Sequence, residues 1–373
     1  MPWQQKDHMT IKIEFIEQAL SKKFKLSELC REYGISRPTA YKWLARYQED
    51  GVNGLAEISR RPHQSPNRTK AEEVELILKT RSEYQAWGGR TLKQYLINQG
   101  HANLPSESTI NRTLHRHGKI LPEESTKRER FIRFERDKPN ELWQMDFKGH
   151  FRTIEGRCHP LTILDDHSRF SICIKACLRE TLETVRPALE DAFRSYGLPD
   201  EMTMDNGPPW KGAPPFRLSR LTVWLMRLGI KVRHSTPYHP QTQGKDERFH
   251  RTLKDEVLKF HQFQGVKEAQ EYFDDWREIY NFHRPHQGIE MKCPSSRYQP
   301  SKKKFIEVLE PVEYGPEDIV RKVQACGTIS YKDKRYFVGE HLKGENVALR
   351  HSHKEGIFEI YFCEIRIGRV NLR

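Results

Sequence analysis

Apolar residues recur at helical intervals in the first part of this chain. From about residue 10 to residue 50 they fall roughly three or four positions apart, with Phe15 on the first apolar face. Gly34 supplies a turn, and Ser36 stands where its hydroxyl can cap a third helix. This arrangement predicts a helix-turn-helix domain over residues 1–52. A small helical bundle with a solvated basic face would have the same pattern.

A second helical pattern covers residues 71–120. It follows a basic linker, rich in glycine and proline, at residues 53–70. Its last helix turns Ile110 and Leu114 inward, which predicts a second helix-turn-helix or winged domain. Residues 121–139 are strongly basic with few helix breakers. We expect there either a connector that lies on DNA or a solvated run of charge.

The pattern changes between residues 140 and 300. Strand-like apolar runs come first, and strands then alternate with amphipathic helices, which predicts an α/β domain. Asp165 and Asp166 lie in a predicted turn between two strands, a position that suits them structurally, so we leave them out of any site. The expected strands cover residues 142–146, 161–164, 170–177, 201–205 and 232–234, and the expected helices cover residues 181–195, about 215–228, the region around Glu247, and 267–282.

Residues 305–373 have a third hydrophobic pattern. Short alternating apolar runs are separated there by glycine and by charged turns, which predicts a small all-β domain that we expect to be a barrel. The chain as a whole is therefore expected to be multidomain. It would have all-α modules at the N-terminus, a central α/β domain and an all-β domain at the C-terminus.

The composition narrows the class of partner. A length of 373 residues allows about two to four domains, and the net charge of +13 favours a polyanionic partner, with nucleic acid ahead of a membrane surface. A merely soluble basic protein is the alternative. The seven cysteines are scattered without metal-binding spacing, which indicates buried free thiols in a reducing cytosol. No apolar run approaches the roughly 18 residues that span a bilayer, so we expect no membrane partner and a cytoplasmic location.

Three carboxylates on three predicted elements suggest a metal site. Asp146 ends one strand, Asp205 ends another just before a Gly/Pro turn, and Glu247 lies on a later helix. Magnesium ions prefer oxygen ligands and are held by few protein carboxylates, with phosphate oxygens completing the shell. Each acid also has a plain structural alternative. The two aspartates could be turn formers, and Glu247 could be an ordinary solvated helix residue.

Helical geometry selects Glu247 from the acids of its helix. At about 100° per residue, Phe249 and the apolar residues one and two turns later share the buried face, and Asp246 falls near them. Glu247 falls roughly opposite, in line with Arg251 and Lys254. An acid in that position can hold a metal ion while the neighbouring cations hold DNA phosphate.

The order of these residues carries a resemblance. After Asp146, the sequence reads Asp205-Asn206-Gly207-Pro208-Pro209-Trp210 at the second acid and His239-Pro240-Gln241-Thr242-Gln243-Gly244-Lys245-Asp246-Glu247-Arg248 at the third. This pattern resembles the DDE-type insertion-sequence transposases, which have a retroviral-integrase-like (rve) catalytic core. The resemblance covers most of the chain. It implies a ribonuclease-H-like fold for residues 140–300 and a C-terminal barrel like that of integrases.

The resemblance also implies a function. Such a protein binds the terminal inverted repeats of an insertion sequence, cleaves the DNA ends and transfers them to target DNA. Asp146, Asp205 and Glu247 would be the catalytic acids and would hold two Mg²⁺ ions, with Mn²⁺ as an alternative. Double-stranded DNA would be the partner, and the protein would act as a homo-oligomer of two or more subunits, in the bacterial cytoplasm near the nucleoid.

Two other functions stay open on sequence alone. One is a metal-dependent nuclease that cuts DNA and stops. The other is a DNA-binding repressor that keeps the catalytic fold but has lost its activity, although three intact acids argue against it.

Candidate DNA contacts are the outward basic and polar residues of the predicted helices, linker and connector. Their spacing does not say which N-terminal module reads bases. They are Arg37, Thr39, Lys42 and Arg46; Arg60 and Arg61; Ser108, Asn111, Arg112 and His115; Arg128, Arg130 and Arg133; and Lys245, Arg248, Arg251 and Lys254.

Overall fold

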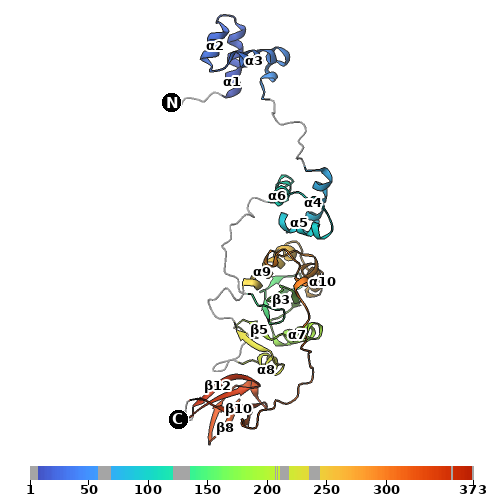
Figure 1. Ribbon diagram of the computed structural model, residues 1–373, viewed down its shortest axis with the longest axis vertical. Helices are drawn as coiled ribbons and strands as arrows, with labels where there is room; N and C mark the ends of the chain where they lie inside the picture. Colours follow the sequence, from blue (N-terminus) through green and yellow to red (C-terminus); the bar gives the residue numbers. More distant parts are fainter. Residues whose placement is uncertain are drawn as a thin grey trace. The chain divides into compact units, whose positions relative to one another are not determined.

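The computed structural model divides the chain into two compact units, Met1–Arg68 and Thr69–Arg373 (Figure 1). It describes residues 7–57, 69–120, 135–205, 207, 209–210, 218–234, 244–353 and 356–371. No helix in these ranges is both long enough and apolar enough to cross a membrane.

The first unit is a three-helix domain. Its helices are α1 (His8–Leu20), α2 (Leu26–Glu32) and α3 (Arg37–Asp50), followed by a short 3-10 turn, η1 (Gly51–Leu55). The Ser36 side chain accepts a hydrogen bond from the backbone N–H of Thr39 at 3.3 Å, so the predicted cap of α3 is confirmed. Leu55 is fully buried in the same core as Phe15. The folded part of this domain therefore extends beyond the expected boundary at residue 52.

The second unit begins with another small helical domain. It contains α4 (Ala71–Glu83), α5 (Gly89–Asn98) and α6 (Glu107–Arg116), packed around a core that includes Trp87. The buried guanidinium of Arg81 donates hydrogen bonds to the carbonyl oxygens of Trp87, at 2.6 Å, and Lys119, at 2.9 Å. Residues 69–120 contain helices and turns only, so of the two predicted forms the plain helix-turn-helix applies rather than the winged one.

A six-stranded mixed sheet forms the centre of the second unit. Its path is β2-β3-β1-β5-β6, and β4 pairs with β3. The pairings among β1 to β4 are antiparallel, whereas β1, β5 and β6 run parallel. The strands are β1 (Leu142–Phe147), β2 (Phe151–Arg152), β3 (Arg157–Asp165), β4 (Ser171–Cys177), β5 (Glu201–Met204) and β6 (Lys231–His234). All five expected strands are confirmed, and the two-residue strand β2 is an addition.

Helices cover both faces of this sheet because its strands alternate two apolar sets of side chains. Trp143 and Ile163 belong to the core formed with α7 (Leu182–Tyr196) and α8 (Arg220–Arg227). Leu164 and Ile174 belong to the core on the other side, formed with α9 (Gly244–Leu253) and α10 (Val266–Glu278). Each of the last two helices continues into a π-helical turn, Lys254–Leu258 and Ile279–His283.

The C-terminal part consists of two antiparallel sheets around one core. The four-stranded sheet has the order β12-β11-β10-β7, and β8 with β9 forms a hairpin. Val223 and Met226 of α8 lie in the same core, so α8 contributes to both the central domain and the β domain. The all-β prediction is confirmed, but the four-stranded sheet is not closed into a barrel among the described residues. The strands are β7 (Ile319–Lys322), β8 (Thr328–Tyr331), β9 (Lys334–Phe337), β10 (Asn346–His351), β11 (Ile357–Phe362) and β12 (Ile365–Asn371).

The polar contacts at the start and end of the central domain explain its boundaries. Glu135 forms ion pairs with Arg169 at 3.0 Å and Arg297 at 2.6 Å, and the Tyr298 hydroxyl donates to the side chain of Asn140 at 3.0 Å. The folded domain therefore includes Glu135, which lies inside the segment expected to be a connector.

Candidate active site

Parallel pairing of β1 with β5 brings two of the predicted acids to the same level of the sheet. The ladder pairs Gln144 with Thr203, and Asp146 and Asp205 each follow two residues later. Asp146 is half-buried within β1, whereas Asp205 is exposed just after β5. The two carboxylates are close enough for the charge of Asp205 to act on the Asp146 carboxyl group.

The environment of Asp146 opposes its ionisation. Burial is the main cause, and the charges of Asp205, Glu180 and Glu247 add to it, so the pKa of Asp146 is raised to about 7. The backbone N–H of Phe147 acts in the opposite direction. An acid surrounded by like charges is stabilised in its ionised form by a cation, and such perturbed carboxyls are frequent at functional sites.

Glu180 is an acidic neighbour of Asp146 that the sequence pattern did not single out. It lies after the end of β4, with its side chain 38% exposed, and its Oε1 is 2.7 Å from Nδ1 of His159. No local motif marks this position, because Glu180 comes near Asp146 only through the pairing of β4 with β3 and of β3 with β1.

Helix α9 is tied to the sheet beside Asp146. Thr162 of β3 lies opposite Asp146 in the β1–β3 ladder, and its hydroxyl donates to the Asp146 carbonyl oxygen at 3.1 Å. The same hydroxyl lies 2.7 Å from Nε2 of His250 on α9. Phe249 and Leu253 complete the attachment from the apolar face of the helix.

The faces of α9 match the expected helical geometry. Phe249 and Asp246 are buried, and Glu247, Arg248 and Arg251 are exposed, as is Lys254 in the following turn. Burial, and then the charge of Asp146, raise the pKa of Asp246 well above its usual value. Among the residues that the structure describes, Oδ1 of Asp246 has no hydrogen-bond partner.

The structure corrects the expectation for Lys245. Its Nζ lies 2.5 Å from Oδ1 of Asp166, and only 12% of its side chain is exposed, so Lys245 faces the domain interior instead of offering its charge to DNA. Burial is the main cause that lowers the pKa of Lys245 to about 8. Asp166 also accepts from the Gln144 side chain at 2.7 Å. Asp165 accepts from the Ser168 N–H, and both aspartates are fully buried.

The described residues contain no group of three His, Cys, Asp or Glu side chains that could hold one metal ion together. The charges of Asp205 and Glu247 both act on the Asp146 carboxyl, but the three acids do not form a closed ligand set among the described residues. Their chemistry nevertheless suits a hard divalent cation, which takes carboxylate oxygens. The raised pKa of Asp146 and the unpartnered Oδ1 of Asp246 are both compatible with a cation nearby.

Candidate DNA contacts in the first domain have different surroundings. Arg37 and Lys42 are exposed on α3. Arg46 is half-buried, with its guanidinium 5.2 Å from the ring centroid of Trp43. The Thr39 hydroxyl lies within the N-terminal cap of its own helix. Arg37 and Lys42 are therefore the more accessible pair.

In the second domain, all four candidates lie on the exposed side of α6. They are Ser108, Asn111, Arg112 and His115. Asn111 also accepts a hydrogen bond from the Gly89 N–H at 3.0 Å, so it holds α5 against α6. The remaining candidates lie outside the described residues: Arg60, Arg61, Arg128, Arg130 and Arg133.

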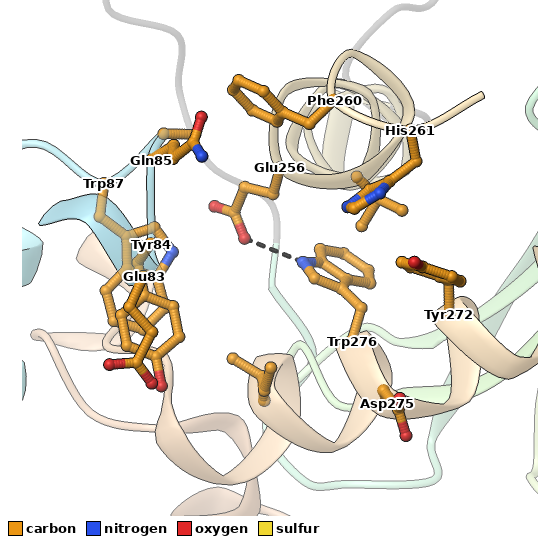
Figure 2. A pocket seen from close by; sticks show the side chains of 13 residues that line it. Glu83, Tyr84, Gln85, Trp87, Glu256, Phe260, His261, Tyr272, Asp275 and Trp276 are labelled. Carbon is orange, nitrogen blue, oxygen red and sulfur yellow. Dashed lines mark hydrogen bonds between the residues drawn. The ribbon is translucent and has the colours of Figure 1, made fainter. Parts of the chain in front are cut away.

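A separate cavity of about 570 Å³ lies between the second helical domain and the central domain. Tyr84 and Trp87 line it from one side, and Trp276 and Glu256 line it from the other (Figure 2). The Trp276 indole N–H donates to the Glu256 carboxylate at 3.0 Å, as the dashed line in Figure 2 shows. None of the three predicted acids lines this cavity, so it is not part of the candidate active site.

Five family models match the chain. The integrase core domain matches residues 136–240 and 228–294, and the C-terminal domain of IS481 family transposases matches residues 318–373. Nearer the N-terminus, a helix-turn-helix domain matches residues 11–63 and a homeodomain-like domain matches residues 39–114. The predicted helix-turn-helix modules and integrase-type core are thereby confirmed.

Two relatives come from bacterial insertion elements. An uncharacterised 39.2 kDa protein of IS476 from Xanthomonas euvesicatoria is 30% identical over 148 residues, which are 40% of this chain and 41% of the relative. An uncharacterised 31.7 kDa protein of IS407 from Burkholderia multivorans is 28% identical over 157 residues, which are 42% of this chain and 54% of the relative. The chain thus spans about half the length of these relatives.

Among solved structures, a chain of the simian T-cell lymphotropic virus intasome in complex with PP2A regulatory subunit B56 gamma is 16% identical. The match covers 76% of this chain and 91% of that chain, with a TM-score of 0.40. The HTLV-2 integrase catalytic core domain in complex with magnesium is 19% identical, covering 44% and 99%, with a TM-score of 0.34. The likeness to insertion-sequence transposases with an integrase core therefore rests on the family models and on the insertion-element relatives.

Proposed function

We propose that this protein binds the terminal inverted repeats of an insertion sequence, cleaves the DNA at those ends and transfers them to target DNA. The observation that carries the proposal is the position of Asp146. This acid lies in the first strand of an integrase core domain, and burial and three nearby acids raise its pKa to about 7. A carboxyl group in such surroundings suits a site that handles positive charge and phosphate.

Asp146, Asp205 and Glu247 are the proposed catalytic acids and ligands of two Mg²⁺ ions, or of Mn²⁺ in their place. When bound, these ions would neutralise charge on the phosphate and on the attacking and leaving oxygens. The chain would contribute position: Asp146 lies in β1, Asp205 follows the neighbouring strand β5, and α9 would present Glu247 to them. Support for Glu247 is its exposure on α9 and its effect on the Asp146 carboxyl.

The proposed reaction is a pair of in-line phosphoryl transfers at one site. In the first, water attacks the phosphodiester at the end of the element; a new P–O bond forms, the bond to the 3′ oxygen breaks, and that oxygen takes a proton. In the second, the freed 3′-hydroxyl attacks a phosphodiester of the target, loses its proton, and displaces another 3′ oxygen. The protein's contribution is chiefly positioning and charge stabilisation.

DNA binding would be divided among the modules. The exposed residues of α3 and α6 would contact the terminal repeats, as recognition helices do in the major groove. The exposed cations after Glu247, namely Arg248, Arg251 and Lys254, would hold phosphates near the cleavage point. Because two ends must be cut together, we propose a homo-oligomer of two or more subunits. The proposed location is the bacterial cytoplasm, at the nucleoid.

The test is a reaction of the purified chain with DNA that carries the ends of its own element, plus Mg²⁺ and a target plasmid. The proposal predicts both cleaved ends and joined products, and neither with Asp146→Asn. Cleavage without joining would identify a nuclease. Binding without cleavage would identify a repressor, and either outcome would overturn the proposal.

A further inference from the structure

The Thr162 hydroxyl joins two elements that carry proposed catalytic acids. Thr162 is fully buried, and its hydroxyl lies 3.1 Å from the Asp146 carbonyl oxygen on β1 and 2.7 Å from Nε2 of His250 on α9. The carbonyl oxygen can only accept, so the hydroxyl is the donor in the first contact. In the second contact, the donor depends on which ring nitrogen of His250 carries the hydrogen.

The surroundings of His250 keep its imidazole ring in the neutral state. Burial is the main cause that lowers the pKa of His250 to about 3, and the nearby positive charge of Lys148 adds to the effect. The ring is therefore neutral at physiological pH. Such a buried donor and acceptor pair is directional, unlike apolar contact.

Directional contacts determine where α9 sits along the sheet. Phe249 and Leu253 pack α9 against the sheet. Apolar packing is non-directional, so it does not by itself fix the rotation of α9 or the position of α9 along the helix axis. Two polar contacts between α9 and the sheet region lie among the described residues: Lys245 with Asp166 near the helix start, and His250 with Thr162 one turn after Glu247. Of these two, only the tie to Thr162 connects α9 with the backbone of Asp146 itself.

We propose that Thr162 and His250 are a positioning pair that holds α9 in register with β1 and so sets Glu247 against Asp146. Neither residue touches substrate in this proposal, and both act through the two acids. The inference rests on the proposed function, because it concerns the placement of the proposed catalytic acids.

The test uses the full-length chain with Thr162→Val, which removes the hydroxyl and keeps the shape, and Thr162→Ser, which keeps the hydroxyl. Thr252→Val is the matched control. Its hydroxyl donates to the Arg248 carbonyl oxygen at 2.9 Å within α9, so its loss leaves the helix attachment to the sheet intact. Three quantities are measured: amide hydrogen exchange over residues 244–253, affinity for end DNA, and the single-turnover cleavage rate at several Mg²⁺ concentrations.

For Thr162→Val we expect α9 amides to exchange about tenfold faster and cleavage to slow by about tenfold or more, the factor that one lost buried hydrogen bond produces. Affinity for end DNA should stay within about twofold of wild type, and more Mg²⁺ should be needed for the half-maximal rate. Thr162→Ser and Thr252→Val should behave like wild type. This combination separates positioning from a general loss of folding, which would reduce DNA affinity as well.

His250→Leu gives a second route to the answer. Alone it should match Thr162→Val, and the double variant should be no slower than either single one, because both remove the same contact. If Thr162→Val does not fold, His250→Gln, which retains an N–H donor, is compared with His250→Leu, and only the latter should be impaired. Unchanged hydrogen exchange in α9, or effects that multiply in the double variant, would overturn the inference. If wild type itself fails to cleave, the proposed function is wrong, and the hydrogen exchange result alone decides on the pair.

Discussion

Lys245 at the start of α9 forms an ion pair with the fully buried Asp166 just after β3, with 2.5 Å between Nζ and Oδ1. This contact reassigns a lysine that sits two residues before Glu247 and next to a run of exposed cations. At about 100° per residue, two positions amount to about 200°, so Lys245 and Glu247 necessarily point to opposite sides of the helix. Lys245 stabilises the attachment of α9 and does not add to its outward charge.

Replacing Lys245 should therefore reduce stability and leave DNA affinity nearly unchanged. Lys245→Met removes the cation from a buried pair and leaves the Asp166 charge poorly compensated, which we expect to cost about 3 kcal/mol of unfolding free energy. Urea unfolding and fluorescence anisotropy with end DNA measure the two quantities. If the variant kept its stability but bound DNA more weakly, Lys245 would be a DNA contact, as the sequence predicted.

Lys254 provides the opposite case on the exposed side of the same helix. Lys254→Met should change the unfolding free energy by less than about 0.5 kcal/mol, as is usual for surface positions. If Lys254 holds a phosphate, log affinity for DNA should fall less steeply with log salt, by roughly one unit of slope. The measurement is a salt titration of DNA binding for wild type and variant. Identical slopes would exclude Lys254 as a phosphate contact.

Acid should destabilise the folded protein through its buried histidines. Burial is the main cause that lowers the pKa of His250, to about 3, and also lowers the pKa of His286. An unfolded histidine takes up a proton near pH 6.5, so between about pH 6.5 and 3 the unfolded chain binds more protons than the folded one. The unfolding free energy should fall as pH falls through this window, by up to about 1.4 kcal/mol per pH unit for each histidine.

The control for this effect is His250→Gln, which cannot titrate. Urea unfolding between pH 7 and pH 5 should show a shallower dependence for the variant than for wild type. Equal dependence in both proteins would mean that His250 is protonated in the folded state.

Much of the fold could be predicted from the chain because its elements have strong local signals. The apolar runs of β1, β3 and β4 and the cap at Ser36 depend on neighbouring residues only, and all are present in the structure. The prediction of a closed barrel was less successful. Closure depends on pairing between distant strands, and alternation within each strand does not report it.

The same distinction applies to the candidate site. Asp146, Asp205 and Glu247 each follow from a local pattern, whereas Glu180 and the contact of Thr162 with His250 arise only when separate elements come together. The error at Lys245 was different. The helical geometry that selects Glu247 already places Lys245 on the buried side, so the sequence contained the correct assignment.

The central claim is that Glu247 completes the acidic site with Asp146 and Asp205, and Glu180 is its natural rival because it also acts on the Asp146 carboxyl. The direct test is the single-turnover rate of end cleavage in Mg²⁺ for Glu247→Gln and Glu180→Gln, with affinity for end DNA measured alongside. We expect Glu247→Gln to be slower by at least about 100-fold and Glu180→Gln to stay within about threefold of wild type, both with nearly unchanged DNA affinity. The account would be contradicted if Glu247→Gln cleaved at the wild-type rate, or if the 100-fold loss of cleavage rate appeared in Glu180→Gln instead.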